Sequence, residues 1–123
     1  MAVPHFSVSV VARGSGRSAV LSAAYRHCAK MEFEREARTI DYTRKQGLLH
    51  EEFVIPENAP DWLRSMIADR SVAGASEAFW NAVEGSEKRS DAQLAKDVTM
   101  ALPIELSADQ NIALVREFVA IHI

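Results

Sequence analysis

An α+β domain, with helices packed against an antiparallel sheet, is the fold class that the sequence predicts. Three observations favour it. Polar and apolar side chains alternate over His5–Val11 with the period of a half-buried strand. A Gly-rich break follows, and Ser18 is placed to cap a helix that runs to about Ala29. Beyond it, extended and helical patterns alternate to the end of the chain. The apolar positions of the first strand are Phe6, Val8 and Val10.

The middle of the chain predicts extended segments and then two helices. Met31–Arg35 and Thr39–Tyr42 are short extended candidates, and His50–Ile55 is a better one. Prolines then end the extended region, and helices are expected over Asp61–Arg70 and Ser76–Lys88. These segments supply the strand pair and the helical layer of the predicted fold.

The last part of the chain predicts one strand and one helix. Alternation late in the segment indicates a strand from about Ala95 to Leu102. Ser107 then starts a final helix, with Gln110 at the capping-box position. The apolar pattern of that helix continues to Ile123 without a capping residue, so we expect a chain cut within a longer domain.

Composition bounds the class of protein. The chain has 123 residues, of which 48% are hydrophobic and 25% charged, so one folded domain is expected and wholesale disorder is excluded. Its apolar runs fall short of the roughly 20 residues of a membrane span. The N-terminus lacks the pattern of a secretory signal, so a cytoplasmic location is expected. With Cys28 as the single cysteine, an internal disulfide is impossible.

Charge is unevenly divided along the chain. Residues 1–45 hold eight Lys and Arg against four acids, a balance of +4, whereas residues 46–123 hold six against thirteen, a balance of −7. Such asymmetry indicates that the first third faces an anion, although ordinary solvated charges would give the same count. The basic residues that could contact phosphate lie around the Gly-rich turn, on the first helix and in a short loop: Arg13, Arg17, Arg26, Arg44 and Lys45.

Tyr25 is the residue that most directly suggests chemistry. On a helix, Ser18, Ser22 and Tyr25 share one face, and the two small hydroxyl residues would leave the ring accessible. A phenol with a pKa of about 10 is a poor nucleophile near neutral pH and needs help from a base, a cation or a metal. The alternative is a half-buried packing residue with a solvated hydroxyl.

Four stretches together resemble the N-terminal part of the MobA/MobL (MobQ-class) conjugative relaxases, most of all the type carried by rhizobial and Agrobacterium plasmids. They span nearly the whole chain in the family's order. The stretches are His5-Phe-Ser-Val-Ser with Gly16-Arg-Ser-Ala-Val-Leu-Ser-Ala-Ala-Tyr-Arg; Asp41-Tyr-Thr-Arg-Lys-Gln-Gly with His50-Glu-Glu-Phe-Val-Ile-Pro; Phe79-Trp-Asn-Ala-Val-Glu with Glu87-Lys-Arg-Ser-Asp-Ala-Gln-Leu-Ala; and Lys96-Asp-Val-Thr-Met-Ala-Leu-Pro-Ile-Glu-Leu-Ser-Ala-Asp-Gln.

The resemblance implies a partial HUH-relaxase-like fold and a tyrosine nickase. Residues 1–123 would be the N-terminal portion of the relaxase domain. Tyr25 matches the nucleophile that attacks a scissile phosphate at the plasmid transfer origin, forming a 5′-phosphotyrosyl link and a free 3′-OH. Asp97 matches an assisting acid, while Thr99 stands where relatives can carry a second carboxylate. Single-stranded origin-of-transfer DNA and the conjugation machinery are the partners that the resemblance implies.

The resemblance also implies a divalent metal, Mg or Mn, held by three histidines. The stretches that carry that triad in the family are not part of this chain, so whether it is an enzyme stays open, and no metal is expected to bind it tightly. Its own histidines, which lack paired ligand spacing, are His5, His27, His50 and His122. Incomplete strand pairing would favour self-association.

Two further functions stay open beside the nickase. The chain could be a non-catalytic remnant that binds single-stranded DNA, or a structural domain without a role on nucleic acid. Trp62 and Trp80 could stack on bases, although apolar neighbours favour a place in the core. Glu51 and Glu52 point to opposite faces of an extended segment, and Cys28 reads as a small packing residue.

Overall fold

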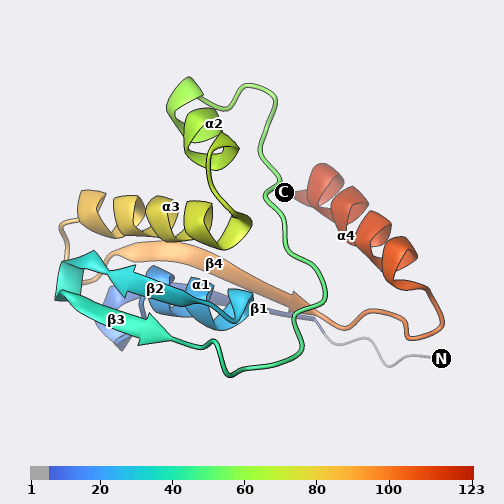
Figure 1. Cartoon of the computed structure of the whole chain (residues 1–123), viewed down its shortest axis with the longest axis horizontal. Helices are drawn as coiled ribbons and strands as arrows, with labels where there is room; N and C mark the ends of the chain where they lie inside the picture. The colour runs from blue at the N-terminus through green and yellow to red at the C-terminus, as the bar shows by residue number, and fades with distance from the viewer. Residues whose placement is uncertain (1–5) are drawn as a thin grey trace. The chain divides into compact units, whose positions relative to one another are not determined.

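A computed structural model describes residues 6–123 of the chain and shows an α+β fold, as predicted (Figure 1). His5 lies outside the described residues. Two compact units divide the chain: Val10–Lys96 forms one, and the other joins the segment up to Ser9 with Asp97–Ile123. In order, the elements are β1 (Phe6–Ala12), the 3-10 turn η1 (Arg13–Ser15), α1 (Ala19–His27), β2 (Lys30–Phe33), the 3-10 turn η2 (Glu34–Glu36), β3 (Arg38–Asp41), α2 (Asp61–Ala68), α3 (Val72–Ser86), β4 (Gln93–Met100) and α4 (Ala108–His122).

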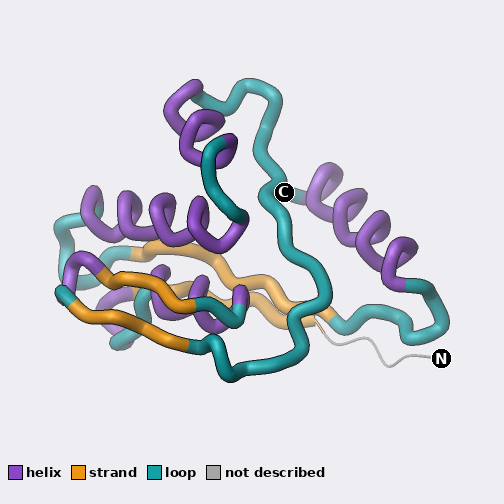
Figure 2. The backbone as a smooth tube through the Cα atoms, in the orientation of Figure 1, coloured by secondary structure: helices purple, strands orange, loops and turns teal. Residues whose placement is uncertain are grey.

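The strands form two separate two-stranded sheets (Figure 2). β1 pairs with β4. β2 and β3 form an antiparallel hairpin in which Lys30 is opposite Asp41 and Phe33 is opposite Arg38. The hairpin turns through η2 and through Ala37, whose φ of 51° places it in the left-handed region.

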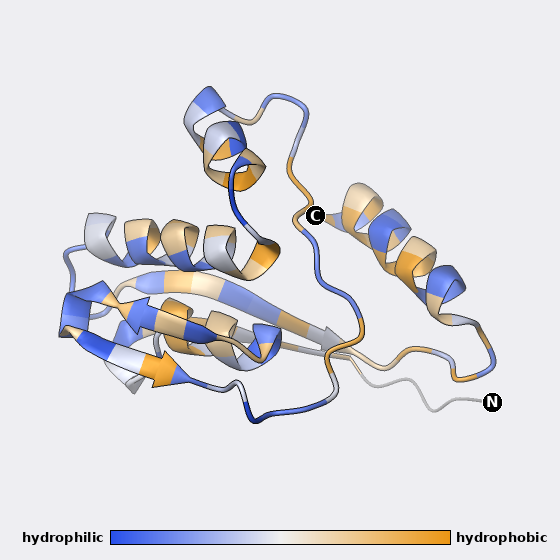
Figure 3. Ribbon diagram, in the orientation of Figure 1, coloured by the Kyte–Doolittle hydropathy of each residue, from blue (hydrophilic) through white to orange (hydrophobic). Residues whose placement is uncertain are grey.

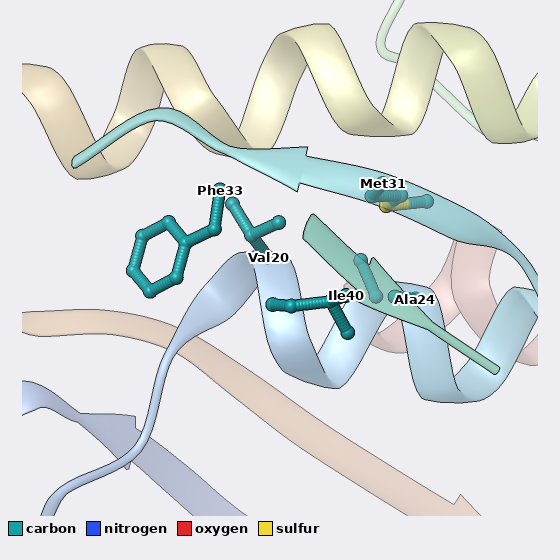
Figure 4. Close-up of a cluster of buried hydrophobic side chains, with 6 residues drawn as sticks. Val20, Ala24, Met31, Phe33 and Ile40 are labelled. Carbon is teal, nitrogen blue, oxygen red and sulfur yellow. The ribbon is translucent and has the colours of Figure 1, made fainter. Parts of the chain in front are cut away.

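The core of the Val10–Lys96 unit lies between α1 and the hairpin. Alternation along β2 buries Met31 and Phe33, which are 1% and 2% exposed, and β3 adds the buried Ile40. Val20 and Ala24 of α1 meet these side chains from below (Figure 4). α3 packs on both α1 and β2, and α2 packs on α3. The first helix is therefore covered on two sides.

A second, smaller core lies beside the first. It joins Val11 and Ala19 with Ala92 and Leu94. Trp80 of α3 packs against both clusters, so its prediction as a core residue is confirmed. Trp62 on α2 is 58% exposed, and the same prediction is wrong there, because few neighbouring side chains cover this short helix.

The half-buried character predicted for the first strand is wrong. Phe6, Val8 and Val10 are 57%, 55% and 40% exposed, and Val11 is the buried residue of β1. Alternation correctly indicated extended backbone, but a two-stranded sheet offers few neighbours to cover either face. Phe6 still makes an edge contact with Phe118 of α4, at 6.1 Å between ring centroids.

The predicted strand at His50–Ile55 is absent, and the third helix begins earlier than expected. Residues 50–55 have no ladder partner among the described residues, because period-two alternation marks extended backbone without supplying a neighbouring strand. α3 begins at Val72 rather than Ser76, because the hydroxyl of Ser71 accepts a hydrogen bond from the amide of Gly74 at 3.0 Å and caps the helix there.

The final helix starts as predicted. The amide of Gln110 donates to Ser107 Oγ, and the amide of Ser107 donates to the Gln110 side chain, which completes the capping box. Hydrophobic and hydrophilic residues alternate along α4 (Figure 3). Within residues 6–123, no helix combines the length and apolar character of a membrane span.

We predict that Phe33→Ala lowers the free energy of unfolding by about 3–5 kcal/mol, because it removes a buried ring from the main core and leaves a cavity. Urea denaturation followed by circular dichroism measures the change. Leu49→Ala is the control, since Leu49 is 92% exposed and its loss is expected to leave stability nearly unchanged. Equal effects of the two variants would contradict this assignment of the core.

Candidate active-site tyrosine

Tyr25 lies in the last turn of α1 with 45% of its surface exposed. The preceding residues, Ala23 and Ala24, are buried against the hairpin, so the helix turns its next residue outward. α1 ends directly afterwards at Cys28, whose φ of 52° is left-handed and whose amide donates to the carbonyls of Ala24 and Tyr25. The tyrosine is thus accessible and sits on a rigid helix end.

Tyr42 supports the ring of Tyr25 from the side. The two rings meet edge to face, with 5.3 Å between centroids and 88° between planes. The amide of Tyr42 donates to the carbonyl of Ala29 at 3.0 Å, which ties the end of β3 to the end of α1. Tyr42 therefore packs against Tyr25 from a position fixed by the backbone.

A tight turn after β3 places a cation over the same ring. Asp41 Oδ1 accepts hydrogen bonds from the amide and the hydroxyl of Thr43, at 2.8 and 2.6 Å. The amide of Lys45 then donates to the Tyr42 carbonyl at 3.0 Å. The Lys45 ammonium lies 4.4 Å from the centroid of Tyr25, within cation–π range, and 3.9 Å from Cys28 Sγ.

The structure therefore brings some of the predicted basic residues to Tyr25. The guanidinium carbon of Arg26 lies 5.7 Å from the centroid of the Tyr25 ring, on the same helix. Arg44, in the turn beside Lys45, is exposed. An accessible phenol beside these cations suits an anionic ligand, because their fields add at the ring's exposed side.

Arg13, another of the predicted basic residues, is bonded within the protein, and its contact with DNA stays a prediction. Its guanidinium, in a side chain that is 10% exposed, donates to the carboxylate and the carbonyl of Glu84, each at 3.0 Å. It also donates to the carbonyls of Glu87 and Arg89 at 2.8 and 2.9 Å. Arg17 donates to the Val10 carbonyl at 3.0 Å.

Asp97 belongs to β4 and is half-buried, in the unit that does not contain Tyr25. Thr99 lies two residues later in the same strand and is also half-buried. Their pairing with Tyr25 therefore stays a prediction from the resemblance.

The described residues do not make a metal centre. Within residues 6–123, no group of three or more His, Cys, Asp and Glu side chains is placed to hold an ion. His27 instead contacts Glu51 at 2.7 Å, and His50 contacts Glu52 at 2.9 Å.

Two residues in contact with α1 or its N-cap are not singled out by the sequence: Tyr42 near the C-terminal end and Glu84 near the N-terminal end. Tyr42 belongs to one of the four stretches, and nothing local marks it as a partner of Tyr25. Glu84 is 2% exposed although it is charged. Its burial could be predicted from the sequence, because Glu84 follows Trp80 by one helical turn and so shares the buried side of α3.

We predict that Thr43→Val raises the pKa of the Asp41 carboxyl. Hydrogen bonds from Thr43, chiefly from its hydroxyl, hold this pKa below the ordinary value of 3.8. A lowered folded-state pKa stabilises the protein above the unfolded pKa, and that contribution is lost as pH falls through the folded pKa. Carboxyl ¹³C NMR titration measures the shift. Thr39→Val, which removes a hydroxyl bonded to Glu32, is the control and should leave Asp41 unchanged.

The sequence of the chain is similar to those of a known protein family. The sequence profile of the MobA/MobL family matches residues 17–123. The chain is 82% identical over 123 residues to the probable conjugal transfer protein TraA of Sinorhizobium fredii and 73% identical to the conjugal transfer protein TraA of Agrobacterium fabrum, and it spans 11% of the length of each. It is 40% identical over 114 residues to the mobilization protein MobL of Acidithiobacillus ferridurans, of which it spans 27%.

A solved structure shares the fold. That structure is described as the molecular basis of vancomycin resistance transfer in Staphylococcus aureus. The match covers 95% of this chain and 55% of the solved chain, with a TM-score of 0.79 and 29% sequence identity. The profile match covers far more than half of the sequence, which confirms the resemblance read from the four stretches. The chain belongs to the MobA/MobL family.

Proposed function

We propose that this chain is the nucleophile-bearing part of a conjugative DNA relaxase that nicks one strand of plasmid transfer-origin DNA. The observation that carries the proposal is the half-exposed Tyr25, held at a helix end beside Lys45 and Arg26. Relatives named as conjugal transfer and mobilization proteins support it.

In the proposed reaction, the phenolic oxygen of Tyr25 attacks the phosphorus of one phosphodiester. The new bond joins this oxygen to phosphorus, and the bond from phosphorus to the 3′-oxygen breaks. The phenol loses its proton to a base, and the leaving oxygen gains one to become a 3′-OH. Because one phosphodiester replaces another, the 3′-OH can later attack the 5′-phosphotyrosyl link and rejoin the strand.

Other residues have supporting roles in the proposal. Arg26, Arg44 and Lys45 would attract the DNA backbone and offset the charge of the scissile phosphate. Asp97 is proposed as the assisting acid on the family resemblance alone. A divalent ion such as Mg or Mn would act as a Lewis acid on the phosphate, with ligands beyond those described here.

We propose single-stranded origin DNA as the substrate and the conjugation machinery as the partner of the whole protein, acting in the bacterial cytoplasm. The chain spans only 11% of its TraA relatives, so a longer protein is the proper subject of functional tests. Binding of single strands without cleavage is the second candidate, supported by the same basic residues beside an exposed aromatic ring.

We predict that Tyr25→Phe abolishes the covalent adduct between the longest protein encoded by the gene and a single-stranded origin oligonucleotide. The ring and its contacts remain, so the affinity for DNA should change by less than about twofold. Denaturing gel electrophoresis of labelled DNA measures the adduct. Tyr42→Phe is the matched control and should still form it. An adduct that persists in Tyr25→Phe would overturn the assignment, whereas binding without any wild-type adduct would favour the second candidate.

We predict that Lys45→Met weakens binding of single-stranded DNA and reduces the slope of log K against log salt by about 0.7, the loss of one phosphate contact. Fluorescence anisotropy at several salt concentrations measures both. Lys88→Met removes the same charge from a lysine that donates to the Gly85 carbonyl at the end of α3, and it should leave the slope unchanged. Equal slopes for Lys45→Met and the wild type would place Lys45 away from the DNA.

A further inference from the structure

Glu84 is a buried carboxylate with two different partners. Its side chain is 2% exposed. Oε1 lies 3.0 Å from a guanidinium nitrogen of Arg13, and Oε2 accepts the hydroxyl hydrogen of Ser18 at 2.9 Å. A buried charge is tolerated when its oxygens are paired in this way, and the pairing then fixes its neighbours strongly.

Ser18 is the residue through which Glu84 reaches α1. It is the N-cap of that helix, and its Oγ accepts a hydrogen bond from the amide of Leu21 at 3.2 Å. A hydroxyl has one hydrogen and two lone pairs. Because the hydrogen is given to Glu84, a lone pair is left facing Leu21. Glu84 therefore orients the cap that starts the helix.

Arg13 completes the connection on the other side. Beside Glu84, it donates to backbone carbonyls at and beyond the end of α3, where carbonyls lack partners within the helix. The segment between β1 and α1 is thus latched onto the end of α3. We call Arg13, Ser18 and Glu84 the α3 latch.

The packing of α1 explains why such a latch would matter. The buried residues of the helix are small: Ala19, Val20, Ala23 and Ala24. Small side chains allow α1 to pack closely on α3, but they carry no hydrogen-bonding group that would orient the helix. Tyr25 lies seven residues after Ser18, about 10 Å along the axis, so a tilt of about 10° at the cap would move it by roughly 2 Å. A displacement of about 1 Å can cost on the order of 100-fold in rate.

We propose that Glu84 is a positioning residue for the tyrosine nucleophile, acting through Ser18 to set the direction in which α1 presents Tyr25. This inference rests on the proposed function of Tyr25. Glu84 acts at the opposite end of the helix from the reacting phenol, so it is expected to affect the rate of adduct formation and to leave the affinity for DNA unchanged.

The test is a double-mutant cycle with Glu84→Gln and Ser18→Ala in the longest protein encoded by the gene. Single-turnover adduct formation with an origin oligonucleotide gives the rate, and anisotropy gives the affinity. Each single variant should form the adduct about 10–100-fold more slowly, with DNA affinity within about twofold of wild type. The double variant should be no slower than the slower single variant, because both changes break one connection.

Two further variants separate positioning from general loss of structure. Ser18→Thr keeps the hydroxyl and should restore most of the rate lost in Ser18→Ala. Glu77→Gln makes the same chemical change on the same helix, but its carboxylate accepts from the amide of Glu32 in β2, so the rate should stay at the wild-type value. If Glu84→Gln does not fold, the adduct rates of Ser18→Ala and Ser18→Thr are compared. Equal rates would overturn the proposal that Glu84 acts through the Ser18 hydroxyl.

Amide hydrogen exchange supplies a readout that does not depend on catalysis. Exchange of the Leu21 amide should be faster in Glu84→Gln than in Glu77→Gln. A wild-type protein that forms no adduct would defeat the proposed function, and Leu21 exchange would then still support or refute the latch. A normal adduct rate in Ser18→Ala, multiplicative losses in the double variant, or unchanged Leu21 exchange would each overturn the role of Glu84.

Discussion

The buried pairing of Glu84 with Arg13 is the interaction on which the helical layer of the Val10–Lys96 unit depends. An unpaired charge in this position would be strongly destabilising, so the guanidinium and carboxylate must meet whenever the unit is folded. The alanine-rich face of α1 permits close packing without specifying it. The directional hydrogen bonds of Glu84 add to these apolar contacts at the helix end farthest from Tyr25.

The β2–β3 hairpin serves the core and the candidate site at the same time. Its inward side chains, Met31, Phe33 and Ile40, close the core against α1. The turn that follows β3 then carries Tyr42 and Lys45 to the end of the same helix. Because the core and the position of Lys45 both depend on this strand pair, a change of register in the hairpin would expose the core residues and also move Lys45 away from Tyr25.

Local signals in the sequence predicted the local structure well and the tertiary surroundings poorly. Ser18 and Ser107 gave the starts of α1 and α4, because a cap is decided within four residues. Alternation at residues 50–55 failed, since pairing depends on a partner strand that periodicity does not reveal. The helix pattern and the family resemblance singled out Tyr25, and the uneven charge singled out its basic neighbours. The bonding of Arg13 to the buried Glu84 could not be predicted in this way, because its partner lies more than 70 positions away.

The surroundings of Tyr25 are local in sequence, and this has a consequence for synthesis of the protein. Tyr25, Tyr42 and Lys45 lie within about twenty positions of one another, and a helix with an adjoining hairpin forms in microseconds. Translation at about 5–20 residues per second would deliver Glu84 roughly 2–8 seconds after Lys45. The aromatic and cationic neighbourhood of Tyr25 can therefore assemble on the nascent chain first, and α3 packs against α1 only afterwards.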